Sequence, residues 1–301
     1  MLMIVLYDYA LKNGGIAILM NESLLFLLEH ADIDVVKFDV HARREIGIFN
    51  RVLKSFYMMT YVKQGKAKLR VGDRTYVLNP GTVIFIPPHV EHDQFKDSDE
   101  ETVFLWWHFT YKIDHCIDVL ALFDIPYVYR LCQSEQFEIA FGQLMHAYGH
   151  NHPITAAIYR KAKSLEVLSI LLDSALSHES SAVRPPITTP FLGLLCGMIR
   201  HIGSRLTLKE IAKELHLNDA YASARFKELF GTSPILMHRQ LKIERAKTLL
   251  ATADMSIMEI AESLGFEELS NFSRFYKSIV GISPMQYRKN IRSSQPAFTR
   301  R

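Results

Sequence analysis

Residues 207–217 read TLKEIAKELHL, and residues 256–266 read SIMEIAESLGF. The two stretches begin 49 residues apart and share a hydroxyl residue, Glu, Ile-Ala and Leu at the same spacing. After one inserted residue the correspondence resumes, because RFKELFGTSP (225–234) matches FYKSIVGISP (275–284) in its aromatic, Lys, Gly and Ser-Pro positions. The C-terminal third is therefore an internal duplication.

Each half of this duplication has the pattern of a helix-turn-helix. Thr207-x-x-Glu210 and Ser256-x-x-Glu259 are capping boxes, which satisfy free N–H groups at a helix start. The following Ile-Ala-x-x-Leu gives a short apolar stripe, in which Ala lets a second helix approach closely. A second helix follows in each half and ends near a Gly with Pro three residues later.

One long helix is predicted between the halves, over Pro234–Leu250. Two recognition helices held by such a connector would enter successive major grooves about 34 Å apart. A helical repeat without a DNA role is the alternative, but two units are too few for a solenoid. Residues 191–301 also carry 17 Lys and Arg against 10 Asp and Glu, whereas the rest of the chain carries 18 against 22. The basic third favours phosphate binding.

The bulk composition indicates a cytoplasmic protein of two domains. The length of 301 residues favours two domains. The sequence contains no run of 18 apolar residues, so we expect neither a membrane span nor a membrane partner. The opening MLMIVLYDYA lacks a basic start and a cleavage site, so we interpret it as a strand or core segment. The three cysteines form no CxxC pair, which favours a reducing compartment and argues against structural zinc.

The N-terminal part is β-rich. Short aromatic and β-branched runs separated by Gly, Asn-Pro-Gly and Pro-Pro turns predict antiparallel hairpins that form a sandwich or small barrel, with strands at 56–63, 67–71, 75–78, 82–86 and 103–109. From residue 114 the period becomes helical, with helices predicted at 134–149 and 154–177. The polar, Pro-rich segment 177–190 follows and is the predicted linker.

The C-terminal motifs carry a specific resemblance. The stretch IERAKTLLATADMSIMEIAESLGFEELSNFSRFYKSIVGISPMQYRK (243–289) contains RAxxLL, IAxxxGF, FSRxxK and GxSPxxYR elements. Residues 206–289 thereby resemble the DNA-binding domain of the AraC/XylS family of bacterial regulators. The resemblance implies a regulator, usually a sugar- or metabolite-responsive activator, that binds direct-repeat half-sites on double-stranded DNA as a homodimer and, if an activator, acts with RNA polymerase.

The first recognition helix departs from the family pattern. It has Ala224 where the family has Arg, while the second half has Arg274 at the equivalent place. An Arg there makes a bidentate contact with guanine that Ala lacks. Arg225 stands where an apolar residue is expected, and we expect it to serve a phosphate.

We therefore expect the second helix to read bases and the first mainly to position the protein. The phosphate candidates are Lys227, Lys277, Arg288 and Lys289. The expected DNA-binding residues are Asn218, Asp219, Tyr221, Ser223, Arg225, Lys227, Leu269, Ser270, Asn271, Ser273, Arg274 and Lys277.

The segment VGDRTYVLNPGTVIFIPPHVEH (71–92) resembles the cupin-type barrel that precedes this DNA-binding domain in many family members. The fold class predicted is thus α+β multi-domain, with an N-terminal cupin-like antiparallel β-barrel with accessory helices and a C-terminal all-α double helix-turn-helix domain. We place the ligand-sensing and dimerisation domain at 1–176, the linker at 177–190 and the DNA-binding domain at 191–301.

A barrel can hold a metal or a small molecule. His41, His89, His92 and His108 are possible imidazole ligands, but the first strand lacks the HxH pair and Glu of cupin metal sites, and His89 replaces the usual Gly. We expect no metal, no cofactor and no catalytic residue. A cupin metalloenzyme with an accessory DNA-binding tail is the alternative.

A small-molecule pocket combines apolar walls with a few polar groups. Strand alternation turns either Trp106 or Trp107 inward, not both. By position, Trp106 and Arg51 match the pocket Trp and a sugar-contacting Arg of the arabinose-responsive member, and an aromatic face with a multidentate Arg suits a sugar. The expected ligand-binding residues are Arg51, Tyr57, His92, Phe104 and Trp106.

Overall fold

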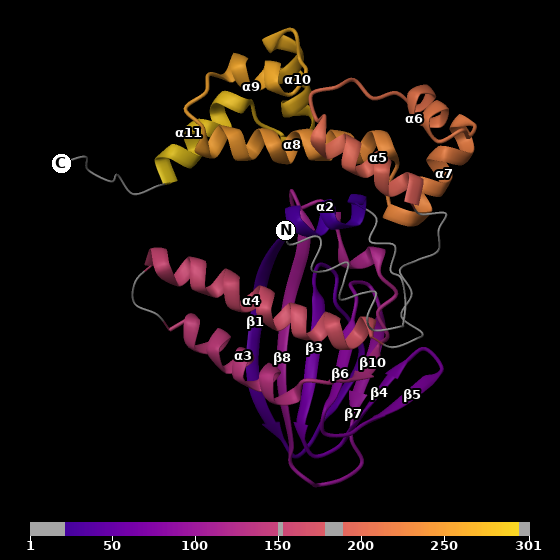
Figure 1. Cartoon of the computed structure of the whole chain (residues 1–301). Helices are drawn as coiled ribbons and strands as arrows, with labels where there is room; N and C mark the ends of the chain where they lie inside the picture. The colour runs from indigo at the N-terminus through magenta and orange to yellow at the C-terminus, as the bar shows by residue number, and fades with distance from the viewer. Residues whose placement is uncertain (1–21, 150–152, 178–188, 295–301) are drawn as a thin grey trace, which may run out of the picture. The chain divides into compact units, whose positions relative to one another are not determined.

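The computed structural model describes residues 22–149, 153–177 and 189–294 (Figure 1). Within these ranges the chain divides into two compact units. One contains residues 31–112 and 118–177, and the other contains residues 22–30, 113–117 and 189–294. Most of the predicted linker and the opening decapeptide lie outside the described residues. None of the described helices combines the length and apolar character needed to cross a membrane.

Two antiparallel sheets build the first unit. The first sheet has the order β1 (Asp32–Arg43), β8 (Thr102–Ile113), β3 (Tyr57–Gln64), β6 (Thr82–Ile86) and β10 (Val128–Arg130), with β9 (Ile117–Asp118) paired to β8. The second has the order β2 (Gly47–Val52), β7 (Glu91–Phe95), β4 (Ala67–Val71) and β5 (Arg74–Leu78). The cupin-like, sheet-rich N-terminal domain predicted from the sequence is confirmed.

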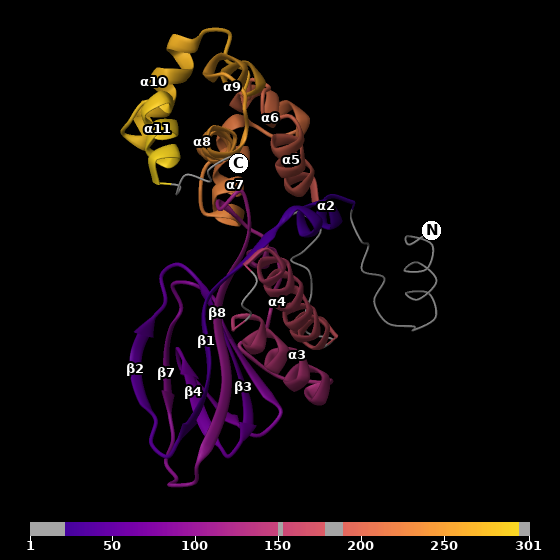
Figure 2. The same cartoon turned by 90° about the vertical axis from the view of Figure 1, so that its left-hand side faces the viewer.

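Helices cover one face of the first sheet. Figure 2 shows three layers, in which helices α3 (Ser134–Ala147) and α4 (Pro153–Leu176) lie on the side of β1, β8 and β3 away from β2, β7 and β4. The Tyr61 ring of β3 packs 5.0 Å from the Phe137 ring of α3, and its hydroxyl donates to Glu138 at 3.1 Å. A short 3-10 turn, η1 (Leu120–Leu122), lies between β9 and β10.

Side-chain alternation sorts β3 and β8 into two faces. Met58 and Val62 pack in the core between the sheets, together with Leu69 of β4 and Leu78 of β5. The intervening side chains of β3 and their partners on β8, such as Trp107, are buried on the face that carries the helices. The covered sheet therefore has two apolar faces, which explains the almost unbroken burial of β3.

Strands β9 and β10 lie in the stretch after residue 114 for which a helical period was predicted, and β1, β2 and β7 were also not predicted from the sequence. A register shift between Val35 and Lys37 breaks the alternation of β1, and such a bulge shifts the period of two by one residue. Strand β7 (EHDQF) is polar, and β2 carries a second register shift. Strands β1, β2 and β7 are held by ladder hydrogen bonds to neighbours that are distant in sequence.

The second unit is all-helical apart from its connections. Its helices are α2 (Glu22–His30), α5 (Thr189–Arg200), α6 (Leu208–Glu214), α7 (Asp219–Phe230), α8 (Pro234–Thr252), α9 (Ile257–Ser263), α10 (Leu269–Val280) and α11 (Pro284–Ser294). Both predicted capping boxes are present. Thr207 N–H donates to the Glu210 carboxylate at 2.9 Å, and Ser256 N–H donates to Glu259 at 2.6 Å. Both recognition helices end at a left-handed glycine, as the repeat predicts.

Helix α8 connects the two helix-turn-helix halves as predicted. Its buried side chains Ile243, Ala246 and Leu250 join those of α9 and α10 in one core, which includes Phe272 and Tyr276. Its Lys242 ammonium donates to the Leu264 carbonyl at the C-terminus of α9 at 2.9 Å. The orientation of the second half thus rests on apolar packing and on a hydrogen bond to a helix end.

Helix α2 precedes the barrel in sequence but packs within the helical unit. The Arg200 guanidinium lies over the Phe26 ring, 4.2 Å from its centroid, and the Cys196 thiol contacts the Ser23 carbonyl at 3.2 Å. The observed units therefore differ from the sequence-based domain boundaries at this helix, since residues 22–30 group with the C-terminal part.

The turn of the second helix-turn-helix has no room for a side chain. Gly265 has φ of +79°, and a Cβ on it would collide with the backbone carbonyl of Gly203. The equivalent turn of the first half uses His216 at φ of +53°, because a non-glycine residue tolerates a left-handed backbone where space allows.

We predict that Gly265→Ala lowers the free energy of unfolding of the helical unit by about 3 kcal/mol, since it adds a backbone collision to left-handed strain. Gly231→Ala is the matched control. Its φ is +77° with no atom near the added carbon, so it should cost only about 1 kcal/mol. Chemical denaturation followed by circular dichroism measures both, and equal losses would contradict the packing argument.

Candidate ligand pocket and DNA-binding face

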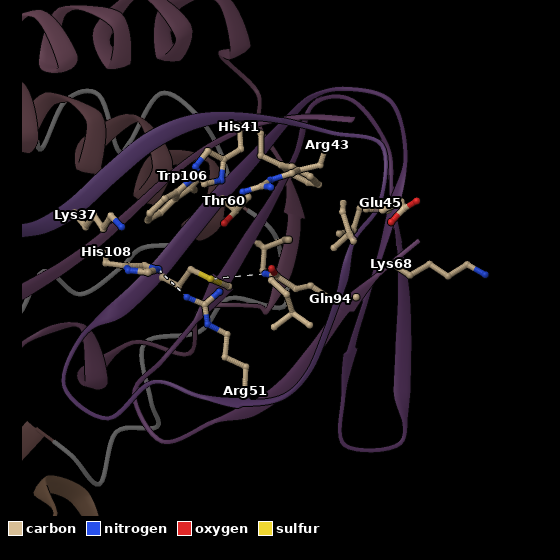
Figure 3. Close-up of a pocket in the computed structure, with 18 residues that line it drawn as sticks. Lys37, His41, Arg43, Glu45, Arg51, Thr60, Lys68, Gln94, Trp106 and His108 are labelled. Atoms are coloured by element: carbon tan, nitrogen blue, oxygen red, sulfur yellow. Dashed lines mark hydrogen bonds between the residues drawn. The ribbon is translucent and has the colours of Figure 1, made fainter. Parts of the chain in front are cut away.

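A cavity of about 480 Å³ lies between the two sheets of the barrel (Figure 3). Its volume falls in the range of small-molecule sites. Strands β1, β2, β3, β4, β5, β6, β7 and β8 all contribute to its wall, so the site depends on the closed arrangement of both sheets. Its lining residues are Lys37, His41, Arg43, Glu45, Ile46, Gly47, Ile48, Arg51, Met58, Thr60, Ala67, Lys68, Leu78, Ile84, Gln94, Phe104, Trp106 and His108.

One wall of the cavity is aromatic. Phe104, Trp106 and His108 alternate along β8 and all face inward. The Phe56 ring stacks on His108 with 4.8 Å between centroids, and the His41 ring lies 5.2 Å from Trp106. The Trp106 indole Nε1 is buried and has no hydrogen-bond partner among the described residues.

Arg51 carries the central charge of the cavity. Its Nη2 lies 3.5 Å from His108 Nε2, a long contact in which the guanidinium must donate because it has no acceptor. His108 Nε2 therefore presents its lone pair to Arg51, and its proton is on Nδ1. Burial lowers the pKa of Arg51 from its usual value. No carboxylate forms an ion pair with Arg51 within the described ranges.

The imidazoles beside Arg51 are neutral near pH 7. Burial, followed by the charges of Arg51, Lys37 and His92, lowers the pKa of His108 to about 4. Burial first and the Arg51 charge also lower the pKa of His92, against the opposing effects of the Val90 carbonyl and the Asp93 carboxylate. These two side chains therefore add no positive charge to that of Arg51. His92 donates from Nδ1 to the Val90 carbonyl at 3.1 Å.

Further polar groups face the cavity from β3 and β7. Thr60 is buried, and the Gln94 amide nitrogen makes only a 3.7 Å contact with the Met58 sulfur. The amide and the Thr60 hydroxyl are therefore available to a ligand. The Lys37 ammonium lies 5.8 Å from the Trp106 ring centroid, which is within reach of a cation–π interaction.

The structure brings together three of the five residues predicted for ligand binding, Arg51, Phe104 and Trp106. Tyr57 lies on the opposite face of β3, where its hydroxyl donates to Asp118 at 2.9 Å and its ring borders a separate hollow. His92 is buried beside the cavity without lining it. Strand alternation could have excluded Tyr57 from the site.

The other fifteen lining residues were not among those predicted for ligand binding, and three of them show why. His108 is two residues from Trp106 on β8, so alternation alone would have placed it in the pocket. Thr60 pairs directly with Trp106 across the ladder, but that register is not visible in the sequence. Gln94 belongs to β7, which was not recognised as a strand.

The four histidines weighed as metal ligands do not converge. His41 and His108 line the cavity, and His89 has a left-handed backbone at φ of +65°, as suits a position where Gly is usual. In the part of the chain that the structure describes, no three His, Cys, Asp or Glu side chains are grouped as metal ligands.

The recognition helices present different residues at equivalent positions. On α10 the Arg274 guanidinium is exposed and donates to Asn271 Oδ1 at 2.7 Å, which orders both side chains on the outer face. The equivalents on α7 are Ala224 and Tyr221, the latter 49% exposed. Among the other predicted residues, those exposed are Asn218, Asp219, Lys227, Leu269, Ser270 and Lys277, whereas Ser223 and Ser273 are half-buried.

Asn218 and Arg225, two further predicted contacts, also have partners in the free protein. Asn218 caps α7, since its side chain accepts from Tyr221 N–H at 2.8 Å. Arg225 is half-buried and pairs with Glu228 at 2.7 Å, which raises its pKa. Either residue must give up or share this interaction to contact DNA.

Two family models match the chain. The AraC-like ligand binding domain matches residues 42–159, and the helix-turn-helix domain matches residues 211–290. The chain belongs to the AraC family. It is therefore a DNA-binding transcription regulator with an N-terminal ligand-binding domain, as the sequence motifs predicted.

Three relatives match this chain over most of its length and most of their own. The chain is 24% identical over 273 residues to an uncharacterised helix-turn-helix regulator, YisR, of Bacillus subtilis, covering 84% of this chain and 90% of that protein. It is 25% identical to the MmsAB operon regulatory protein of Pseudomonas aeruginosa, with coverage of 79% and 77%. It is 22% identical to the arabinose operon regulatory protein of Escherichia coli, with coverage of 77% and 80%.

We predict that Arg51→Gln raises the pKa of His108 from about 4, because a repelling charge is removed while burial still keeps the pKa below the usual 6.5. Lys37→Gln is the control and should produce a smaller rise, as its charge has the weaker effect. Titration of the His108 ring protons by NMR measures both shifts. An unchanged pKa in Arg51→Gln would contradict the contact between the two side chains.

Proposed function

We propose that this regulator binds a small sugar-like effector in its barrel cavity and responds by changing how a homodimer holds paired DNA half-sites. The observation that carries the proposal is the cavity itself, in which an aromatic wall faces Arg51 and unsatisfied polar groups. Sugars present apolar faces for stacking and hydroxyls for multidentate donors, so this combination suits them. The arabinose operon relative supports the same ligand class.

The proposed activity is regulatory and not catalytic. We propose that the protein activates transcription and that RNA polymerase is its partner in doing so. We place the protein in the cytoplasm, where an operator and a metabolite are both accessible. Residues 191–301 form the proposed DNA-binding domain, and 177–190 form the proposed linker. Helix α2 is assigned to the DNA-binding part because it packs on α5.

The two recognition helices have unequal proposed roles. Helix α10 reads bases through Arg274 and Asn271, because an exposed guanidinium can bind guanine with two hydrogen bonds and Asn can bind adenine likewise. Helix α7, with Ala224 at the matching place, positions the domain through Tyr221 and Lys227. Lys277 serves a phosphate near the C-terminal end of α10.

Dimerisation is proposed through the outer face of α4. Ile158 is 69% exposed and Leu165 36% exposed, and seven residues of spacing put them on one stripe of the helix. Exposed aliphatic side chains in such a stripe suit a helix–helix contact between two copies. The same helix buries Val167 and Leu171 within its own domain, so its two faces have different partners.

The test of function is selection of fragmented genomic DNA by the purified protein, with sequencing of the retained fragments. Wild type should enrich two half-sites about one helical turn apart. Arg274→Ala should lose preference at one base pair and about 1–3 kcal/mol of affinity. The control, Lys277→Ala, should weaken binding to all sequences alike and reduce the salt dependence.

Two outcomes would contradict this assignment. Unchanged specificity in Arg274→Ala would show that α10 does not read bases through this residue. Failure of wild type to enrich any site, with metabolite extract present or absent, would contradict regulation by sequence-specific binding.

The dimer surface has its own test. Ile158→Asp and Leu165→Asp should convert the protein to a monomer in sedimentation equilibrium, because each places a charge in an apolar contact. Ala157→Asp is the control, since residue 157 is exposed and lies about 100° around the helix from residue 158. A dimer that survives both apolar substitutions would place the interface elsewhere.

A further inference from the structure

The walls of the barrel cavity are unevenly charged. Four cationic side chains line it, Lys37, Arg43, Arg51 and Lys68, against the single carboxylate of Glu45. Lys68 is neutralised by Asp97 at 2.5 Å. The three remaining cations, Lys37, Arg43 and Arg51, still outnumber the carboxylate, and the neutral imidazole of His108 adds no charge.

The Glu45 carboxylate and the half-buried Arg51 guanidinium lie in different parts of the cavity. Figure 3 shows Glu45 on the side of the pocket away from Lys37 and His108, with Arg51 reaching toward His108. Arg51 therefore has an imidazole and no carboxylate as its described neighbour in the cavity. A half-buried guanidinium without a counter-ion is unfavourable, because burial removes water that its charge would otherwise hold.

Several other charges of the barrel have partners of opposite sign. Asp93 is 5% exposed, and it accepts from Asn50 N–H at 2.7 Å and from Arg70 Nε at 2.6 Å. Lys63, on the helix side of the sheet, pairs with Glu138 at 2.7 Å. The fold thus supplies counter-ions to Lys63, Lys68 and Asp93, whereas among the described residues no carboxylate pairs with the half-buried Arg51.

We infer that the effector is an anion, a sugar derivative whose carboxylate or phosphate binds Arg51 between Trp106 and the β7 wall. A guanidinium binds either group with two parallel hydrogen bonds. Lys37 lies beside His108 on the same side of the cavity (Figure 3) and adds attraction, while the polar groups of Thr60 and Gln94 remain for hydroxyls. The inference rests on the proposed function in using the same cavity, and it narrows the ligand from neutral sugars to acidic or phosphorylated ones.

The test compares matched ligands on the full-length protein. Glucose, gluconate, glucuronate and glucose 6-phosphate form one set, and galactose, galacturonate and galactose 6-phosphate form another. Affinity is measured by isothermal titration calorimetry at two salt concentrations. We expect at least one anionic member to bind about 100-fold more tightly than its neutral partner, with an affinity that falls as salt rises. The carboxylate and phosphate members separate the two sources of negative charge.

Variants test the role of Arg51. Arg51→Gln should reduce affinity for the anion about 100-fold, whereas Arg51→Lys should retain part of it because the charge remains. Lys63→Gln removes one positive charge outside the cavity and should leave affinity unchanged. Circular dichroism establishes that each variant is folded.

The outcomes separate this inference from the proposed function. Neutral sugars that bind as well as their acids, or the absence of binding by every anion, would overturn the anionic effector. An anion that binds through Arg51 but does not alter affinity for the selected operator DNA would support the inference and contradict ligand-gated regulation. Binding that is insensitive to Arg51→Gln would place the anion elsewhere and also overturn it.

Discussion

The two-residue alternation of β8, which pairs with both β1 and β3, governs both the stability and the ligand site of the N-terminal domain. Trp107 and Phe109 stack with their ring centroids 4.4 Å apart and are buried on the face that the helices cover. The residues between and beside them, Trp106 and His108, face the cavity. Because a strand sends successive side chains to opposite faces, one strand supplies the core and the binding wall, and a one-residue slip would exchange them.

The same separation of tasks occurs in the DNA-binding unit, where the helical period replaces the strand period. Phe272 and Tyr276 of α10 are fully buried in the core with α8 and α9. Asn271 and Arg274, one residue before and two after Phe272, are exposed and hydrogen-bonded to each other. The packing that holds α10 in place therefore also fixes the direction in which the Asn271 and Arg274 side chains point.

In the part of the chain that the structure describes, neither Arg51 in the cavity nor Arg274 on α10 pairs with a carboxylate. In the cavity, the neutral state of His108 follows from burial and from Arg51, so the local charge belongs to the guanidinium. On α10, Arg274 is exposed and held by a neutral amide. In contrast, Arg225 of α7 is paired with Glu228, which agrees with a smaller role for the first recognition helix.

The sequence by itself determined the elements whose signals are local: the capping boxes at Thr207 and Ser256, the duplicated helix pairs, the β-hairpin turns and the family. It also selected Trp106 over Trp107 and included Arg51. Only the tertiary structure decided the positions of Thr60 and Gln94 in the cavity wall and the packing of α2 on α5, whereas the period of two along β8 already relates His108 to Trp106. The reason is physical: caps and turns are made by residues a few positions apart, whereas a cavity and its charge balance depend on ladder register and on strands, such as β7, that are stabilised by distant partners.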